Sequence, residues 1–277
     1  MTSSPIGVQG IPIAYEVHGE GRSILLIHGW SADRQYLLAD FEPIFAEHPG
    51  WQRIYLDLPG HGSTPAPEWL STTDRMISIV NDFVDAVLPK GRFAIVGSSY
   101  GGRVALGLVR LIPDRLTGAG LVVPAVTAAD GSMDLAETRV FVEDPSVLED
   151  LGPDEEWMRE ALVVQERWIV DEIRATDMPA YRRADYEFLE RLEASECATG
   201  AAGSPGSPFD RPSLILTGRQ DCYVGYRLAW GLLDELPRAT FAALDMAGHQ
   251  LGRIERPVPF RALVGDWLER MAMVREG

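Results

Sequence analysis

The chain has 277 residues, of which 46% are hydrophobic and 24% are charged, a composition typical of a folded protein rather than a disordered one. Acidic residues outnumber basic ones by 41 to 25, and the resulting net charge of −16 argues against nucleic acid or an anionic membrane as a partner. The N-terminus lacks the pattern of a secretory signal, no apolar run is long enough to cross a bilayer, and two cysteines are too few for a disulfide framework, so we expect a cytoplasmic protein.

Short apolar runs alternate with longer helical patterns along most of the chain. Strand patterns, rich in Ile, Leu and Val, are IPIAYEVHG (11–19), SILLIHG (23–29), RIYLDLPG (53–60), FAIVGSS (93–99), GAGLVVPA (118–125), SLILTGRQD (213–221) and ATFAALDMAGH (239–249). Helical patterns lie at Gln35 to Glu47, Thr73 to Leu88, Tyr100 to Leu111, Tyr223 to Leu236 and Pro257 to Met271. This α/β alternation predicts a mostly parallel central sheet of about eight strands, with helices on both faces and chemistry at the carboxyl ends of the strands.

The alternation stops between residues 126 and 205. The segments DEEWMREALVVQERWIVDEIRA (154–175) and PAYRRADYEFLERLEAS (179–195) have helical periodicity, and ATGAAGSPGSP (198–208) is typical of a flexible return. The apolar stripes expected on these helices comprise Trp157, Ala161 and Trp168, and then Tyr181, Phe188 and Leu192. We therefore predict an all-helical lid at 126–205, inserted into a core domain formed by 1–125 and 206–277.

The predicted lid carries most of the negative charge of the chain. It contains 20 acidic and 7 basic residues, a net charge of −13 out of −16. Two explanations remain open at this point. The carboxylates either form a solvated surface that keeps the protein in solution, or some of them select a cationic substrate, such as an ester or peptide with a free amine.

The segment VGSSYGG falls where a predicted strand becomes a predicted helix. A nucleophile on such a tight turn has a strained backbone, so the residues two positions on either side of it must be small. Ser99 has Gly97 and Gly101 at those positions, whereas Ser98 would have a valine and a tyrosine there. We therefore predict Ser99 as the nucleophile.

A serine hydroxyl needs a base, and the base needs an acid that orients it. Of the five histidines, His249 alone follows the serine, at the end of the last predicted strand. Asp221, just after the preceding strand, completes the order serine, aspartate, histidine that accompanies a nucleophile on this kind of turn. Asp245, within the last strand, and Asp130, after an earlier one, are the alternatives for the acid.

The motifs HGW, LDLPGHGST, GSSYGG, GRQD and AGH, in this order and spacing, resemble the α/β-hydrolase superfamily over nearly the whole chain. Further stretches, GWSADRQ with FEPIF and GRQDCYVGY, resemble a subgroup of bacterial hydrolases without an assigned activity. The resemblance implies an oxyanion hole made by two backbone N–H groups, those of Trp30 and Tyr100. The side chains of Trp30, Tyr100 and Tyr223 are also expected to contact substrate.

These features together predict a cofactor-free serine hydrolase that cleaves an ester or related acyl bond of a small to medium substrate. Because His249 must be neutral to act, activity should rise with pH through roughly 6 to 7. The histidines have no metal-ligand spacing and no dinucleotide-binding GxGxxG motif is present, so neither a metal nor another cofactor is expected.

Other activities use the same three residues and stay open. An aminopeptidase like proline iminopeptidase, a lactonase and a hydrolase of carbon–carbon bonds all share this chemistry. A receptor on the same fold that binds its ligand without turnover is a further alternative. The sequence leaves the oligomeric state open, as monomer or homodimer.

Overall fold

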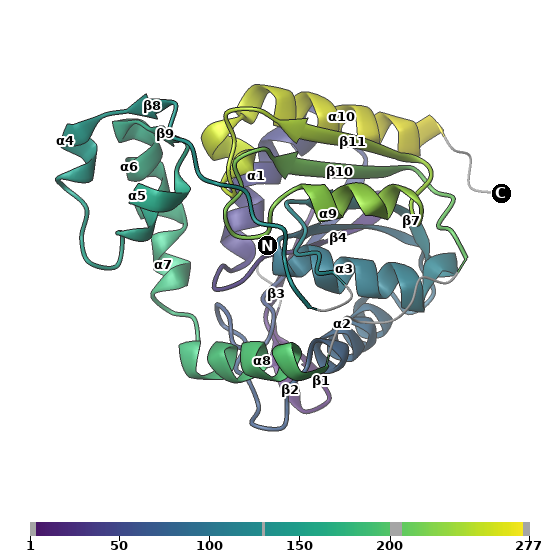
Figure 1. Cartoon of the computed structure of the whole chain (residues 1–277). Helices are drawn as coiled ribbons and strands as arrows, with labels where there is room; N and C mark the ends of the chain where they lie inside the picture. The colour runs from purple at the N-terminus through teal and green to yellow at the C-terminus, as the bar shows by residue number, and fades with distance from the viewer. Residues whose placement is uncertain (1–3, 129–130, 200–206, 274–277) are drawn as a thin grey trace.

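The centre of the computed structural model, which describes residues 4–128, 131–199 and 207–273, is a seven-stranded sheet in the order β11-β10-β7-β6-β4-β5-β3 (Figure 1). All neighbouring strands are parallel except β3, which runs antiparallel to β5. The strands are β3 (Tyr15–His18), β4 (Arg22–Ile27), β5 (Trp51–Leu56), β6 (Phe93–Ser98), β7 (Leu116–Val122), β10 (Ser213–Gly218) and β11 (Ala239–Leu244). The expectation of a mostly parallel sheet is confirmed.

The first strand pattern of the sequence divides between two sheets. Residues 11–13 form β2 (Ile11–Ile13), which pairs antiparallel with β1 (Ile6–Val8) in a separate hairpin. Residues 15–18 form β3 and enter the main sheet at its edge, beside β5.

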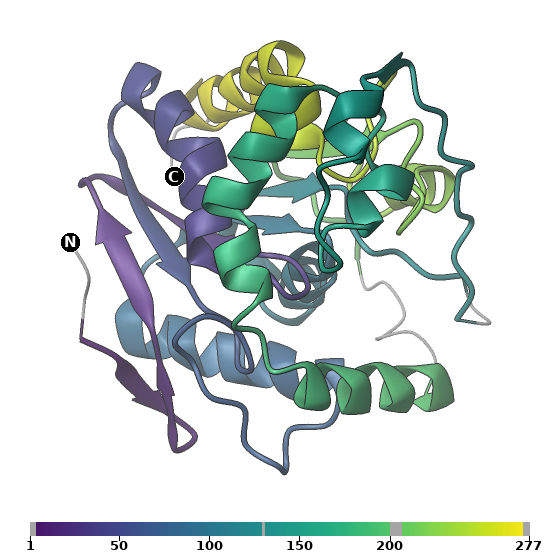
Figure 2. The same cartoon turned by 90° about the vertical axis from the view of Figure 1, so that its left-hand side faces the viewer.

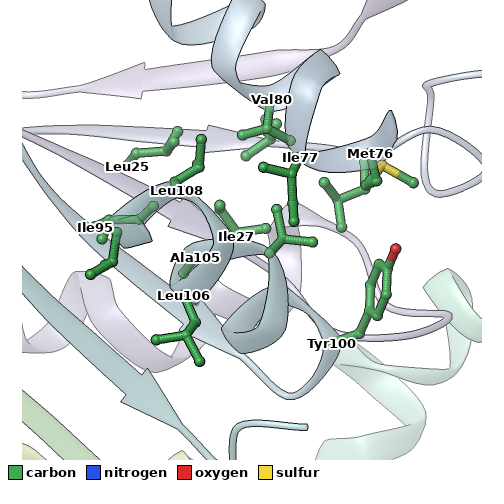
Figure 3. Packing of buried hydrophobic residues seen from close by; sticks show 14 of the residues in the cluster. Leu25, Ile27, Met76, Ile77, Val80, Ile95, Tyr100, Ala105, Leu106 and Leu108 are labelled. Carbon is green, nitrogen blue, oxygen red and sulfur yellow. The ribbon is translucent and has the colours of Figure 1, made fainter. Parts of the chain in front are cut away.

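Helices cover both faces of the sheet because each strand presents apolar side chains on both sides. In β4, Ile24 and Leu26 pack with α1 and α10, whereas Leu25 and Ile27 pack with α2 and α3 (Figures 1 and 3). This alternation is the two-residue period of a strand that is buried on both faces. The helices are α1 (Arg34–Glu47), α2 (Thr73–Val87), α3 (Tyr100–Leu111) and α10 (Pro257–Met273).

The helix expected at Tyr223 to Leu236 is mostly absent. Only α9 (Arg227–Trp230) and the short turn η2 (Gly231–Leu233) are helical there. The preceding residues form a loop because the carboxylate of Asp221 accepts the N–H groups of Tyr223 and Val224, and because Gly225 has a φ of +67°.

The described part of the segment expected to be an all-helical lid contains five helices and one short pair of strands. The elements are β8 (Val142–Glu143), α4 (Pro145–Leu148), α5 (Trp157–Ala161), β9 (Val164–Gln165), α6 (Arg167–Thr176), α7 (Met178–Tyr181) and α8 (Tyr186–Thr199). The expected helix at 154–175 is interrupted at Leu162 and Val163, whose side chains are buried. Trp168, expected in its apolar stripe, is 48% exposed.

The helices of this segment pack in two separate places. Phe188 and Leu192 of α8 join the apolar cluster of α2 and α3, and α8 lies apart from α4, α5 and α6 (Figures 1 and 2). The earlier helices form their own apolar cluster, which includes Met178 and which Ile254 of the core joins. The division into a lid at 126–205 and a core remains a prediction, and residues 129–130 and 200–206, with the expected flexible return, lie outside the described residues.

Arg253, in the irregular helical turn η3 (Leu251–Glu255), connects the segment to the core through ion pairs. Its guanidinium lies 2.9 Å from Asp40 Oδ1 of α1 and 3.1 Å from Glu172 Oε1 of α6, and it also pairs with Asp177. Asp40 and Asp177 are both buried. Burial raises the pKa of Asp177 to about 6, although Arg253 acts in the opposite direction. The single positive charge of Arg253 thus faces three carboxyl groups.

Asp177→Asn should flatten the dependence of stability on pH. Folded Asp177 keeps its proton up to a pH of about 6, whereas an unfolded aspartate releases it near about 4, so the free energy of unfolding falls as the pH rises through this window. Urea unfolding between pH of about 4.5 and 6.5 should give a shallower decline in the variant. Asp171→Asn, at an exposed carboxylate of α6, is the control that keeps the wild-type slope. Equal slopes in Asp177→Asn and the wild type would contradict the prediction.

Candidate active site

Ser99 occupies the turn between β6 and α3 in the strained conformation that the sequence predicts. Its φ and ψ are 54° and −119°, a combination that costs a residue with a side chain on the order of 1–3 kcal/mol. A Cβ on Gly97 would lie 2.2 Å from the carbonyl oxygen of Gly101, and a Cβ on Gly101 would lie 2.2 Å from that of Ile27. Gly97 is therefore required for the start of α3 to lie close to the end of β6, and Gly101 for the turn to pack against the end of β4.

Three side chains from different strand ends form a continuous line of hydrogen bonds. His249 Nε2 lies 3.0 Å from Ser99 Oγ, and His249 Nδ1 lies 2.8 Å from Asp221 Oδ2. Because a carboxylate only accepts, Nδ1 carries the proton and Nε2 presents its lone pair to the serine hydroxyl. These contacts join residues 99, 221 and 249 at the rim of the sheet.

Asp221 is fully buried, and its second oxygen is occupied as well. Oδ1 accepts the N–H groups of Tyr223 at 2.9 Å and Val224 at 3.0 Å, which fixes the plane of the carboxylate. The alternative acid Asp245 is exposed and accepts a hydrogen bond from Gln220 rather than from His249. The other alternative, Asp130, lies outside the described residues.

The electrostatics of the site favour a protonated His249. Burial by itself lowers the pKa of the imidazole, but the charge and hydrogen bond of Asp221 outweigh it, and the pKa is raised above the ordinary value. Glu255 adds a smaller contribution in the same direction. The neutral form that can accept a proton is therefore populated at a higher pH than the sequence alone predicts.

Two further histidines lie beside the loop after β4, and no role was predicted for the first of them, His28. His28 Nδ1 donates to the carbonyl of Gly29 at 2.8 Å, and its Nε2 accepts the N–H of Leu58 at 3.0 Å. Burial lowers the pKa of His28, and it lowers that of His61, whose ring lies 4.9 Å away, to about 3. Both imidazoles are neutral at physiological pH. In the sequence, each of these histidines directly precedes a glycine, in HGW (28–30) and HGS (61–63), and this pattern indicates a histidine in a turn.

The loop held by His28 reaches the nucleophile. A Cβ on Gly29 would lie 3.0 Å from Ser99 Cβ, so the peptide that leads into Trp30 is in contact with the serine. The rings of Trp30 and Tyr100, the two predicted contributors of backbone N–H groups, meet edge to face at 5.1 Å. The hydroxyl of Tyr100 lies 2.9 Å from Thr73 Oγ1.

Ser99 and His249 open into a cavity of about 860 Å³ that the core and the predicted lid enclose together. Its walls include the side chains of Trp30, Tyr100, Trp157, Met178, Tyr181 and Tyr223. Tyr223 is 43% exposed, and its ring stands edge to face with that of His249 at 5.3 Å. The acidic side chains of Asp74, Asp154 and Glu193 also line the cavity, but all three are exposed and lie toward solvent.

Within the described ranges, no group of three His, Cys, Asp or Glu side chains has an arrangement that could hold a metal ion. The same residues include no helix that is both long and apolar enough to span a membrane.

A model of the alpha/beta hydrolase family matches residues 24–263. The chain belongs to the alpha/beta hydrolase family. This hydrolase is 28% identical, over 96% of its length and 91% of the relative, to 2-hydroxy-6-oxo-6-(2'-aminophenyl)hexa-2,4-dienoic acid hydrolase of Metapseudomonas resinovorans. It is 33% identical to pimeloyl-[acyl-carrier protein] methyl ester esterase of Legionella pneumophila (strain Paris), over 38% of each chain.

The same fold is found in a crystal structure of an alpha/beta superfamily hydrolase from Oenococcus oeni PSU-1. That structure matches with a TM-score of 0.83 at 23% identity, covering 98% of this chain and 100% of the other. The relatives are named hydrolases and esterases, and this alpha/beta hydrolase is accordingly an enzyme of the hydrolase class.

Gly101→Ala should destabilise this hydrolase by about 3 kcal/mol or more, because the added methyl group would meet the backbone oxygens of Ile27 and His28 at 2.2 and 2.4 Å. Gly231→Ala is the matched control, since nothing lies within 4 Å of its Cβ position. Chemical unfolding of both variants measures the difference. Equal stability would refute the steric argument for the nucleophile turn.

Proposed function

We propose that this hydrolase cleaves an ester or related acyl bond through an acyl-enzyme on Ser99. The observation that carries the proposal is the unbroken line of hydrogen bonds from Ser99 through His249 to Asp221, which borders a cavity of about 860 Å³. This arrangement supplies a nucleophile, a base and the carboxylate that orients the base.

In the first half of the reaction, Ser99 Oγ attacks the acyl carbon while His249 Nε2 takes the hydroxyl proton. Asp221 holds the imidazole in the required tautomer and offsets the positive charge that develops on it. The carbonyl oxygen becomes an oxyanion, which we assign to the backbone N–H groups of Trp30 and Tyr100. Two such donors each lower the barrier by roughly 3–4 kcal/mol.

The tetrahedral intermediate then collapses and the bond from carbon to the leaving alkoxide oxygen breaks. His249 returns its proton to that oxygen, so an alcohol departs and the acyl group remains on Ser99. In the second half, His249 removes a proton from water and the hydroxide attacks the acyl carbon. Release of the acid regenerates Ser99 with the proton from His249.

The substrate that best fits the cavity contains an aromatic or similarly broad apolar group. The volume of about 860 Å³ is in the range of small-molecule sites, and aromatic side chains stand on both the core and the lid walls. The edge-to-face pairs Trp30–Tyr100 and Trp157–Tyr181, at 5.1 and 5.9 Å, occur one on each wall. Such walls gain most from a planar apolar ligand.

Selection of a cationic substrate, the second explanation of the acidic lid, has less support. Among the described lining residues, the carboxylates lie in exposed positions, and that of Asp154 is paired with Arg182 at 2.8 Å. An aminopeptidase of the proline iminopeptidase kind needs a carboxylate that meets the amine inside the cavity. We therefore propose that the exposed acidic residues of the lid form a solvated surface.

Hydrolysis of a carbon–carbon bond is the second candidate function. It is favoured by the relative from Metapseudomonas resinovorans, which is similar over 96% of this chain and whose name gives a dienoic acid with an aminophenyl group. The aromatic walls suit such a compound as well as they suit an aryl ester. A panel of aryl esters, lactones and vinylogous diketones separates the activities.

Ser99→Ala should lower the turnover of p-nitrophenyl esters by about 10⁴-fold or more and abolish labelling by a fluorophosphonate probe, with unchanged thermal unfolding. Ser98→Ala is the matched control at the adjacent hydroxyl, and it should keep both the ester turnover and the labelling by the probe. Turnover retained by purified Ser99→Ala would rule out the proposed mechanism. Ligand binding without any turnover in the wild type would instead favour a receptor.

Trp157→Ala should lower kcat/KM for p-nitrophenyl phenylacetate by at least about tenfold, with little change for p-nitrophenyl acetate. Trp157 lines the cavity, and we expect its ring to contact only the larger acyl group. Trp168→Ala removes the same side chain from an exposed position of the lid and should leave both substrates unaffected. Equal losses for the two substrates in Trp157→Ala would contradict an aromatic subsite.

A further inference from the structure

The buried carboxylate of Glu255 accepts a hydrogen bond from the loop that carries His249. Glu255 ends η3 and is 8% exposed. Its Oε2 accepts the N–H of Gly248 at 2.6 Å, and its Oε1 accepts the N–H of Val163 at 2.9 Å. Gly248 directly precedes His249, whereas Val163 lies in the predicted lid between α5 and β9. One carboxylate therefore joins the lid backbone to the loop of the candidate base.

The two segments that Glu255 joins are also in close contact with each other. A Cβ on Gly248 would lie 2.9 Å from the carbonyl oxygen of Ala161 and 3.2 Å from Val163 Cγ2. Ala161 and Val163 are both buried. Because the gap has no room for even one methyl group, a displacement of this part of the lid would displace the loop that carries His249.

Glu255 also contributes charge to the site. Burial raises its pKa to about 7, although the N–H groups of Val163 and Gly248 act in the opposite direction. The charged groups that face Glu255 are Asp221 and His249, and His249 in turn faces Asp221 and the ring of Tyr223. When ionised, Glu255 favours the imidazolium that forms as Ser99 loses its proton.

We propose that Glu255 is a positioning residue that couples closure of the lid to the alignment of His249 with Ser99. The proposal rests on the function proposed above for Ser99 and His249. With the lid in place, both N–H groups meet the carboxylate and the imidazole stands at hydrogen-bond distance from the serine. When the carboxylate is replaced, the buried N–H groups of Val163 and Gly248 have fewer acceptor atoms, and the position of the loop relative to Ser99 is no longer fixed.

Glu255→Gln tests the coupling, because it keeps the shape of the side chain but leaves one carbonyl oxygen for two N–H donors. We expect kcat for p-nitrophenyl acetate to fall by about tenfold or more with KM nearly unchanged, since a misplaced base slows chemistry more than binding. The acidic limb of the pH profile of kcat/KM should also move to lower pH, because the imidazolium loses a neighbouring negative charge.

Glu235→Gln is the matched control. Glu235 is also 8% exposed and forms a two-pronged ion pair with Arg110, at 2.8 and 2.9 Å, but it does not line the cavity. Its replacement should lower the unfolding temperature without changing the pH profile. Glu255→Asp is the second variant, which keeps the charge but shortens the reach. It should lower kcat while the acidic limb stays near that of the wild type.

The outcomes separate this proposal from the proposed function. If Ser99→Ala abolishes turnover and both Glu255 variants change only the unfolding temperature, as Glu235→Gln does, the coupling is refuted and the serine mechanism stands. If Ser99→Ala retains turnover, the mechanism itself fails, whatever Glu255 does. A loss of kcat with a shifted acidic limb in Glu255→Gln, and an unshifted limb in Glu255→Asp, supports the coupling.

Discussion

The left-handed backbone of Ser99 is the constraint on which the site depends. This conformation projects the hydroxyl away from the end of β6, and it persists because the turn is tightly packed. There is no space for a side chain at Gly97, which faces the backbone at the start of α3, or at Gly101, which faces the carbonyl oxygens at the end of β4. Hydrogen bonds of the Ser99 backbone with Val122 and Ala125 tie the turn to the next strand as well. Contacts with β4 and β7, at the centre of the sheet, thus keep Ser99 in its strained conformation.

The parallel sheet then determines what can meet this hydroxyl. Asp221 and His249 follow β10 and β11, whose carboxyl ends lie at the same edge as the end of β6. Each side chain is fixed by the backbone of its own loop, Asp221 through two N–H donors and His249 through the loop that Glu255 holds. The accuracy of the site therefore comes from loops anchored on rigid strands rather than from direct packing among the three residues.

The features that the sequence predicted well depend on local steric or periodic signals. The glycines around Ser99 and the apolar runs of β4, β6 and β10 are of this kind. The features that it missed depend on distant partners. The helix expected from Tyr223 gives way to a loop because a buried carboxylate competes for its N–H groups, and Ile11–Ile13 leaves the main sheet because it pairs with Ile6–Val8. Glu255 gave no signal, since a single acid before a helix is usually a surface residue.

The segment above the cavity is held to the rest of the chain at several separate places, and this limits how it can be exchanged. Helix α8 belongs to the apolar cluster of α2 and α3, whereas α4 to α7 rest on η3 through Ile254 and the ion pairs of Arg253. A chimera that imports the whole segment from a relative would bring neither set of complementary contacts with it. A chimera that keeps α8 would retain its contacts with α2 and α3, but an exchange of α4 to α7 must also supply partners for Ile254 and Arg253.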